Sequence, residues 1–181
     1  MAYDLEDINL LVVEDTFPML VLAKSLLHIF GFRNILTAKT GEEGYALYKQ
    51  YKPDVVITDW FMEPMDGIQL TQKIRHDEDS PNPYTPIIMV SGYGSRARVE
   101  NARDNGVTEF IIKPYTAKDL YNKITQLIEN PRPFVKTDNY FGPERRRRNA
   151  EYNGPFRRES DKDNSQKDNQ DEKNNVNDMS A

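Results

Sequence analysis

Up to about residue 129, short apolar runs alternate with longer segments in which apolar residues recur with a helical period. This alternation is the signature of βαβ units, which assemble into a parallel sheet. The pattern predicts five units. The strands are expected at 10–13, 34–38, 55–58, 87–90 and 110–112. The helices are expected at 18–30, 41–51, 67–75, 96–105 and 117–129.

The boundaries of these helices carry capping residues. Two helix starts have the spacing of a capping box, in Thr40 with Glu43 and in Thr116 with Asp119. Gly31 and Gly106 lie just past two helix ends, where a left-handed backbone is common. Three of the predicted strands are almost wholly apolar, as expected for strands that are covered on both faces.

Beyond residue 130 the character of the chain changes. Pro131 and Pro133 interrupt it, and the apolar periodicity stops. We therefore expect a folded domain at 1–130, an arginine-rich extension at 131–158 and a disordered polar tail at 159–181. The hydrophobic fraction of 38% and the mean hydropathy of -0.76 agree with a chain that is only partly folded.

Composition also bounds the cellular context. No cysteine is present, which excludes disulfides and thiolate metal sites and fits a reducing compartment. Asp4, Glu6 and Asp7 stand where a secreted protein would have a basic start and an apolar run. No apolar stretch approaches the ~20 residues that span a bilayer. We expect a cytoplasmic protein without membrane insertion.

Polar side chains follow four of the predicted strands. They are Glu14 and Asp15 after the first, Asp59 after the third, Ser91 after the fourth and Lys113 after the fifth. Ligands of open α/β sheets bind outside the carboxyl ends of the strands, so these residues can converge. Crowded carboxylates repel one another unless a hard cation such as Mg²⁺ compensates. A lysine and a serine hydroxyl can both contact a phosphoryl group.

Each of these residues also has an ordinary structural explanation. An acid after a strand is often a helix N-cap, Lys113-Pro114 can be only a turn, and Ser91-Gly92 is common loop chemistry. A site is favoured by their joint placement, because all of them fall at strand ends of one five-unit frame.

Four ordered motifs carry a family resemblance. They are Val12-Val13-Glu14-Asp15, Asp59-Trp60-Phe61-Met62-Glu63-Pro64-Met65-Asp66-Gly67, Ser91 and Lys113-Pro114. Over roughly residues 9–129 the chain resembles the CheY-like receiver family. The resemblance implies a flavodoxin-like, doubly wound (βα)5 fold with parallel strand order 2-1-3-4-5. It also implies a Lys113-Pro114 bond that is often cis, in line with the small cis penalty of X-Pro bonds.

The resemblance also assigns roles to residues. Asp59 is the implied phosphoacceptor, and Mg²⁺ is held by Glu14, Asp15, Asp59 and the backbone carbonyl of Phe61. Lys113 pairs with the phosphoryl group and Ser91 hydrogen-bonds it, and positioning and electrostatics supply most of the catalysis. After phosphorylation Ser91 moves inward and the aromatic side chain of Phe110 follows. Phe110 and Phe61 depart from the family, because a hydrogen-bonding aromatic and a polar residue are more usual there.

The expected function is that of a response regulator without a folded output domain, phosphorylated by a histidine kinase or phosphotransfer protein. It would catalyse only its own phosphorylation and dephosphorylation. We also considered a magnesium-dependent phosphatase of the haloacid dehalogenase type. That class needs a second acid two residues after its nucleophile, at the end of the first strand. Position 61 is Phe and Asp59 follows the third strand, which argues against it.

The segment after the predicted domain is rich in arginine. From 145 to 158 there are six arginines and one acid, and the pattern Y-x-G-P-x-R-R occurs at 140–146 and again at 152–158. The candidate anion-binding residues are Arg145, Arg146, Arg157 and Arg158, interleaved with Tyr140, Phe141, Tyr152 and Phe156.

Three explanations of this segment stay open. It can be a solvated extension, or a binder of single-stranded RNA or DNA. It also resembles the arginine-rich extension of the Cle group of CheY-like proteins, which binds cyclic di-GMP and acts at the flagellar motor. The second function that we consider is therefore a second-messenger or RNA binder gated by the receiver.

Overall fold

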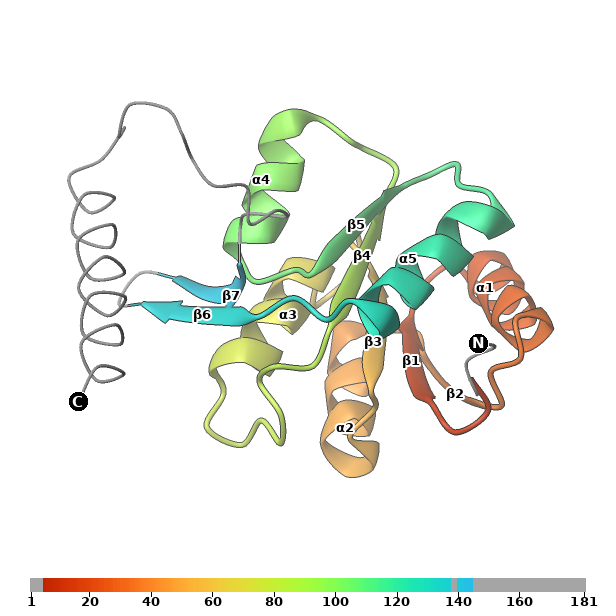
Figure 1. The fold of residues 1–181 in the computed structure, drawn as a ribbon, viewed down its shortest axis with the longest axis horizontal. Helices are drawn as coiled ribbons and strands as arrows, with labels where there is room; N and C mark the ends of the chain where they lie inside the picture. The colour runs from red at the N-terminus through yellow and green to blue at the C-terminus, as the bar shows by residue number, and fades with distance from the viewer. Residues whose placement is uncertain (1–4, 138–139, 145–181) are drawn as a thin grey trace, which may run out of the picture. The chain divides into compact units, whose positions relative to one another are not determined.

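The computed structural model describes residues 5–137 and 140–144. Five strands form a parallel sheet in the order β2-β1-β3-β4-β5 (Figure 1). The strands are β1 (Asn9–Val13), β2 (Asn34–Ala38), β3 (Val55–Asp59), β4 (Ile87–Ser91) and β5 (Glu109–Ile112). The helices are α1 (Phe17–Ile29), α2 (Gly41–Tyr51), α3 (Gly67–His76), α4 (Arg96–Asp104) and α5 (Ala117–Glu129). The expected flavodoxin-like fold and its strand order are confirmed.

The three central strands are buried because alternate side chains enter different cores. In β1, Leu10 and Val12 pack with residues of α1 and α5, whereas Leu11 and Val13 pack with residues of α2 and α3. The helices accordingly cover both faces of the sheet (Figure 1). None of the helices in the described part of the chain is long and apolar enough to cross a membrane.

The helix ends follow the expected capping chemistry with one difference. Gly31 and Gly106 have positive φ values of 101° and 92°, and Thr116 and Asp119 form a complete capping box. At α2 the Thr40 hydroxyl accepts the N–H of Glu43, but the Glu43 carboxylate accepts the N–H of Lys39, at 2.8 Å, rather than that of Thr40. This α2 box is therefore displaced by one residue. Asp66 and Gln69 form a further box at α3 that the sequence analysis missed.

The folded unit continues beyond the boundary expected at residue 130. Strands β6 (Phe134–Thr137) and β7 (Tyr140–Pro143) form an antiparallel hairpin, which belongs to the same compact unit as the rest of the described residues. Phe141 is buried and its ring lies 5.3 Å from Tyr84 and 6.0 Å from His76. The boundary expected at residue 130 lies before this hairpin, because prolines interrupt the chain there and the apolar residues of the hairpin show no periodicity.

The hairpin also rests on a buried arginine of α3. The Arg75 guanidinium lies 4.9 Å from the Phe134 ring and donates hydrogen bonds to the carbonyls of Pro83, Thr85 and Gly106. Burial lowers the pKa of Arg75 to about 10, so the side chain is still charged at neutral pH. At Gly142 a Cβ atom would lie 2.8 Å from the Gly106 Cα atom, so the glycine allows close backbone packing.

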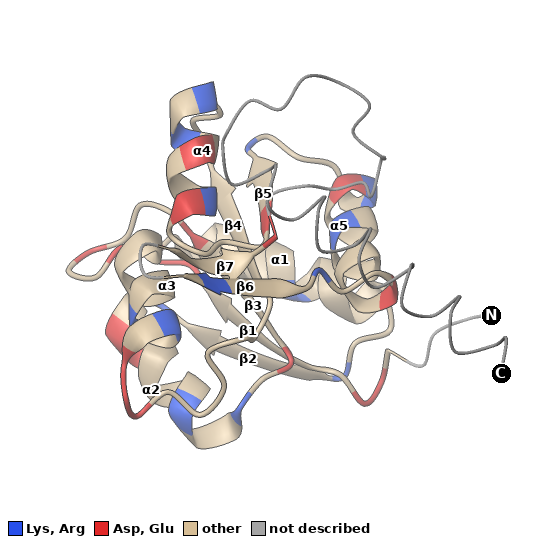
Figure 2. Ribbon diagram, turned by 60° about the vertical axis from the view of Figure 1, so that its left-hand side comes forward, with Lys and Arg blue, Asp and Glu red and all other residues tan. Residues whose placement is uncertain are grey.

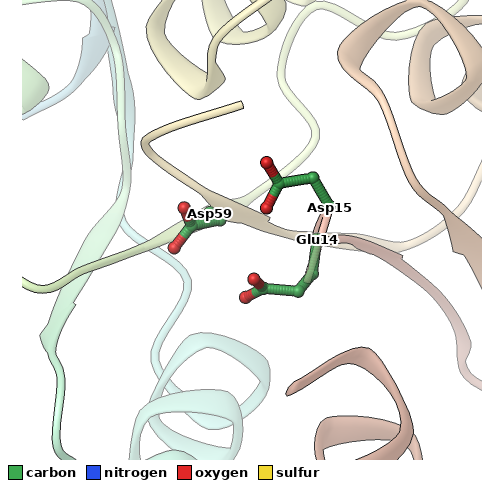
Figure 3. Close-up of side chains that lie close together, drawn as sticks. All are labelled: Glu14, Asp15 and Asp59. Carbon is green, nitrogen blue, oxygen red and sulfur yellow. The ribbon is translucent and has the colours of Figure 1, made fainter. Parts of the chain in front are cut away.

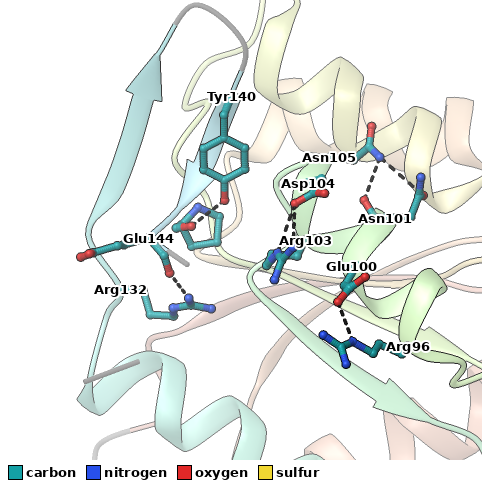
Figure 4. Close-up of polar contacts among 10 residues, drawn as sticks. Arg96, Glu100, Asn101, Arg103, Asp104, Asn105, Arg132, Tyr140 and Glu144 are labelled. Atoms are coloured by element: carbon teal, nitrogen blue, oxygen red, sulfur yellow. Dashed lines mark hydrogen bonds and ion pairs between the residues drawn. The ribbon is translucent and has the colours of Figure 1, made fainter. Parts of the chain in front are cut away.

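This packing changes the interpretation of the first Y-x-G-P-x-R-R copy. Tyr140 and Phe141 were expected to contribute to an anion site. Instead, the Tyr140 hydroxyl donates to the Pro143 carbonyl (Figure 4), and Phe141 is buried in the fold. The second copy, the four candidate arginines and the polar tail lie outside the described residues.

Candidate functional site

Three carboxylates meet at the carboxyl edge of the sheet (Figure 3). Ligand oxygens of Glu14, Asp15 and Asp59 all lie within 4.8 Å of one another. Because β1 and β3 are neighbours, with Val13 opposite Thr58, the residues that end the two strands are brought side by side. Glu14 and Asp59 are buried and Asp15 is exposed. The structure thus brings together three of the acids predicted from sequence.

Lys113 reaches two of these acids from the end of β5. Its Nζ atom lies 2.5 Å from Asp59 Oδ1 and 2.8 Å from Glu14 Oε2. Burial alone would lower the pKa of Lys113, but the hydrogen bonds and negative charges of Asp59 and Glu14 outweigh it. The pKa of Lys113 is therefore raised above its ordinary value. The ammonium stays charged at neutral pH and compensates one of the three carboxylates.

The backbone after Asp59 wraps closely around its carboxylate and its carbonyl. The Phe61 N–H donates to Asp59 Oδ2 at 2.9 Å, and the Gly67 N–H donates to the Trp60 carbonyl at 2.9 Å. A Cβ atom at Gly67 would lie 2.1 Å from the Asp59 carbonyl oxygen. Only glycine allows α3 to begin so close to β3, and the sequence analysis did not anticipate this requirement.

The two predicted switch residues lie on adjacent strands. Ser91 is fully buried, and its Oγ accepts the Tyr93 N–H at 3.2 Å. Phe110 is half-buried, with its ring in an edge contact to Trp60 at 6.1 Å. The Lys113 N–H donates to the Ser91 carbonyl at 2.7 Å, so the chain segments that carry Ser91 and Lys113 are joined directly.

Two peptide bonds near the site are cis. The Lys113-Pro114 bond is cis, as expected, and Glu63-Pro64 is a second cis bond that was not expected.

Tyr93 and Arg98 contact the loop after Asp59, and neither was singled out from the sequence. Nothing marks Arg98 in the sequence, because its neighbours are set by how α4 docks.

The donor set fits a hard divalent cation. The site holds three carboxylates and one ammonium, which leaves two negative charges uncompensated. Asp15, one of the three acids, is open to solvent. Oxygen ligands of this kind, completed by water or phosphate oxygens, are those that Mg²⁺ prefers. The site can therefore collect a cation and an anionic phosphoryl group at one place.

The structure is a doubly wound α/β sheet with an acid cluster and a lysine at its strand ends. A family model described as response regulator receiver domain matches residues 10–125. Chemotaxis protein CheY-3 of Vibrio cholerae serotype O1 is 33% identical over 124 residues, covering 68% of this chain and 94% of that protein.

Solved structures agree with this match. A response regulator receiver domain protein from Clostridium thermocellum has a TM-score of 0.61 and 31% identity, covering 67% of this chain and 94% of that one. A chain of the CheX-CheY-BeF3-Mg+2 complex from Borrelia burgdorferi has a TM-score of 0.61 and 28% identity, covering 67% and 89%. The chain belongs to the response regulator receiver family, which acts in two-component signalling.

Proposed function

We propose that this receiver accepts a phosphoryl group on Asp59 in a magnesium-dependent reaction and changes conformation in response. The observation that carries the proposal is the contact of Asp59 with Lys113 inside a cluster of three carboxylates. A buried acid with a charged lysine and spare negative charge around it suits the transfer of a phosphoryl group, which needs charge neutralisation more than covalent chemistry.

Each site residue is proposed to have a separate role in the transfer. Glu14, Asp15 and Asp59, with the Phe61 carbonyl, would hold Mg²⁺, which neutralises charge on the transferring group when bound. A carboxylate oxygen of Asp59 attacks the phosphorus atom, and the bond to the donor breaks with its electron pair leaving on the donor. Lys113 pairs with the phosphoryl oxygens and Phe61 N–H orients the carboxylate. The similar chain from Borrelia burgdorferi was solved in a CheX-CheY-BeF3-Mg+2 complex, which supports a Mg²⁺ site in this fold.

The conformational response is proposed to run through Ser91 and Phe110. The Ser91 hydroxyl would leave the Tyr93 N–H for a phosphoryl oxygen, and Phe110 would move with it against Trp60. Helix α4 beside them has a single buried residue, Ala102, among its described side chains. An element with so little buried apolar surface can shift at low cost.

Membership of the receiver family supports a proposal for the partners of this protein. A histidine kinase or phosphotransfer protein would supply the phosphoryl group. The relatives named as chemotaxis proteins support a role in chemotaxis signalling, and the flagellar motor stays a proposed target.

Labelling by acetyl phosphate in the presence of Mg²⁺ tests the proposal. Asp59→Asn keeps the shape of the side chain but removes the anionic nucleophile, so the variant should take up no phosphoryl group. Asp54→Asn is the matched control, because Asp54 precedes β3 and binds the Asn9 N–H at the opposite edge of the sheet. Wild type and the control should label alike, and labelling of Asp59→Asn to the same extent would refute the assignment.

A further inference from the structure

A guanidinium on α4 lies against three aromatic rings beside the acid cluster. The Arg98 Cζ atom is 4.7 Å from the ring centroid of Tyr93, 5.0 Å from that of Phe61 and 5.6 Å from that of Trp60. Within the described part of the chain no carboxylate forms an ion pair with Arg98. Its charge is therefore directed at the ring faces, where cation–π attraction holds it.

Two of these rings belong to residues that touch the site through their backbone. Phe61 lies two residues after Asp59 and donates its N–H to Asp59 Oδ2. Tyr93 lies two residues after Ser91 and donates its N–H to Ser91 Oγ. The Phe61 and Tyr93 rings meet edge to face at 5.6 Å. Arg98 thus links the β3–α3 loop to the β4–α4 loop at the residues that contact the acceptor and the switch serine.

Much of the surface of both rings is open to solvent. Phe61 is 47% exposed and Tyr93 is 61% exposed, so neither is held by core packing. Helix α4 carries both basic and acidic residues (Figure 2). Two of its other arginines are paired with acids, Arg96 with Glu100 and Arg103 with Asp104 (Figure 4). Phe61 also stacks on Trp60, with ring centroids 6.2 Å apart. Arg98 is the cation that contacts both exposed rings as well as Trp60.

We propose that Arg98 is a positioning residue that holds Phe61 and Tyr93 as an apolar rim at Asp59 and thereby slows loss of the phosphoryl group. In that loss a water oxygen attacks phosphorus, the bond from phosphorus to the Asp59 oxygen breaks, and its electron pair returns to the carboxylate. Inorganic phosphate leaves with the protons of the water. A rim of ordered rings restricts the positions from which water can attack. This inference rests on the proposed function of Asp59.

The role of Arg98 is tested by measuring how fast Asp59 loses its phosphoryl group after acetyl phosphate is removed. Arg98→Ala should lose phosphate about fivefold faster than wild type, the factor expected when one exposed cation–π contact no longer closes the rim. Arg98→Lys keeps a cation and should recover part of the slow rate. Arg96→Ala is the control, since Arg96 lies on the same helix and pairs with Glu100 (Figure 4). Equal rates in wild type and Arg98→Ala, or equal acceleration by both alanine variants, would overturn the inference.

A second measurement does not depend on phosphorylation. Trp60 is the single tryptophan of the chain, is 9% exposed and lies under Arg98. Quenching of its fluorescence by acrylamide should rise in Arg98→Ala, rise less in Arg98→Lys and stay unchanged in Arg96→Ala. Unchanged quenching in Arg98→Ala would refute the rim even if its hydrolysis rate differed. If wild type cannot be labelled, the proposed function fails, whereas this readout still decides whether Arg98 shields Trp60 and the Phe61 ring stacked on it.

Discussion

Replacing Lys113 by methionine tests the charge balance of the site. Methionine keeps an unbranched apolar stem but cannot contact Glu14 and Asp59, which Lys113 bridges at 2.8 Å and 2.5 Å. Two neighbouring carboxylates would then lack their counter-charge. We expect opposite effects on two quantities: the free energy of unfolding without divalent cations should fall, and the affinity for Mg²⁺ should rise.

The magnitudes follow from burial. Removing one partner of a buried ion pair costs about 3–5 kcal/mol. The side chains of Glu14 and Asp59 are each 9% exposed but that of Lys113 is 23% exposed, so solvent screens part of the interaction. We therefore expect a loss of about 2–3 kcal/mol. Removing one positive charge from the edge of the site should tighten Mg²⁺ binding by about tenfold, or about 1.4 kcal/mol.

Urea unfolding at pH 7, in EDTA and in excess Mg²⁺, measures the first quantity. The pKa of Lys113 is raised in the folded protein, so its stabilising charge is complete below the ordinary lysine pKa and is lost only as pH rises through the raised value. At pH 7 the comparison is therefore with a fully charged lysine. Mg²⁺ should restore most of the lost stability, because it binds only the folded site.

Titration of Trp60 fluorescence with Mg²⁺ measures the second quantity. Lys118→Met is the matched control, because Lys118 is an exposed lysine in the first turn of α5. It should change neither stability nor affinity. A Lys113→Met variant that binds Mg²⁺ more weakly than wild type, or that is as stable as wild type in EDTA, would show that the lysine does not balance these carboxylates.

Two other predictions concern the hairpin and the arginine-rich segment. Arg75→Met should lower the free energy of unfolding in urea by about 3 kcal/mol, because two buried carbonyls and one part-buried carbonyl lose their donor at about 1 kcal/mol each. A loss below about 1 kcal/mol would contradict this. If the segment outside the described residues binds cyclic di-GMP, alanine at four positions should abolish the calorimetric signal and leave labelling of Asp59 unchanged. The positions are Arg145, Arg146, Arg157 and Arg158. A wild-type chain that binds single-stranded RNA instead would favour the nucleic-acid alternative.

The sequence by itself determined the five-unit core and the place of the acid cluster. Strands such as β3 and β4 are apolar except at their carboxyl ends, and each is followed by a segment with helical period, so their boundaries are set by local pattern. A parallel sheet places all its carboxyl ends at one edge. Asp59 and Lys113 could therefore be expected to meet, although 54 residues separate them.

Only the tertiary structure decided which surfaces meet outside this frame. The hairpin at Phe134–Thr137 and Tyr140–Pro143 packs against Tyr84 and Arg75, which lie far away in sequence. No periodic pattern of apolar residues predicts this hairpin. Gly142 and Pro143 lie within β7, although local preference alone favours a turn at a Gly-Pro pair. The ring partners of Arg98 likewise come from two segments, the β3–α3 loop and the β4–α4 loop. Such contacts depend on the shapes of packed elements, and those shapes exist only after the chain has folded.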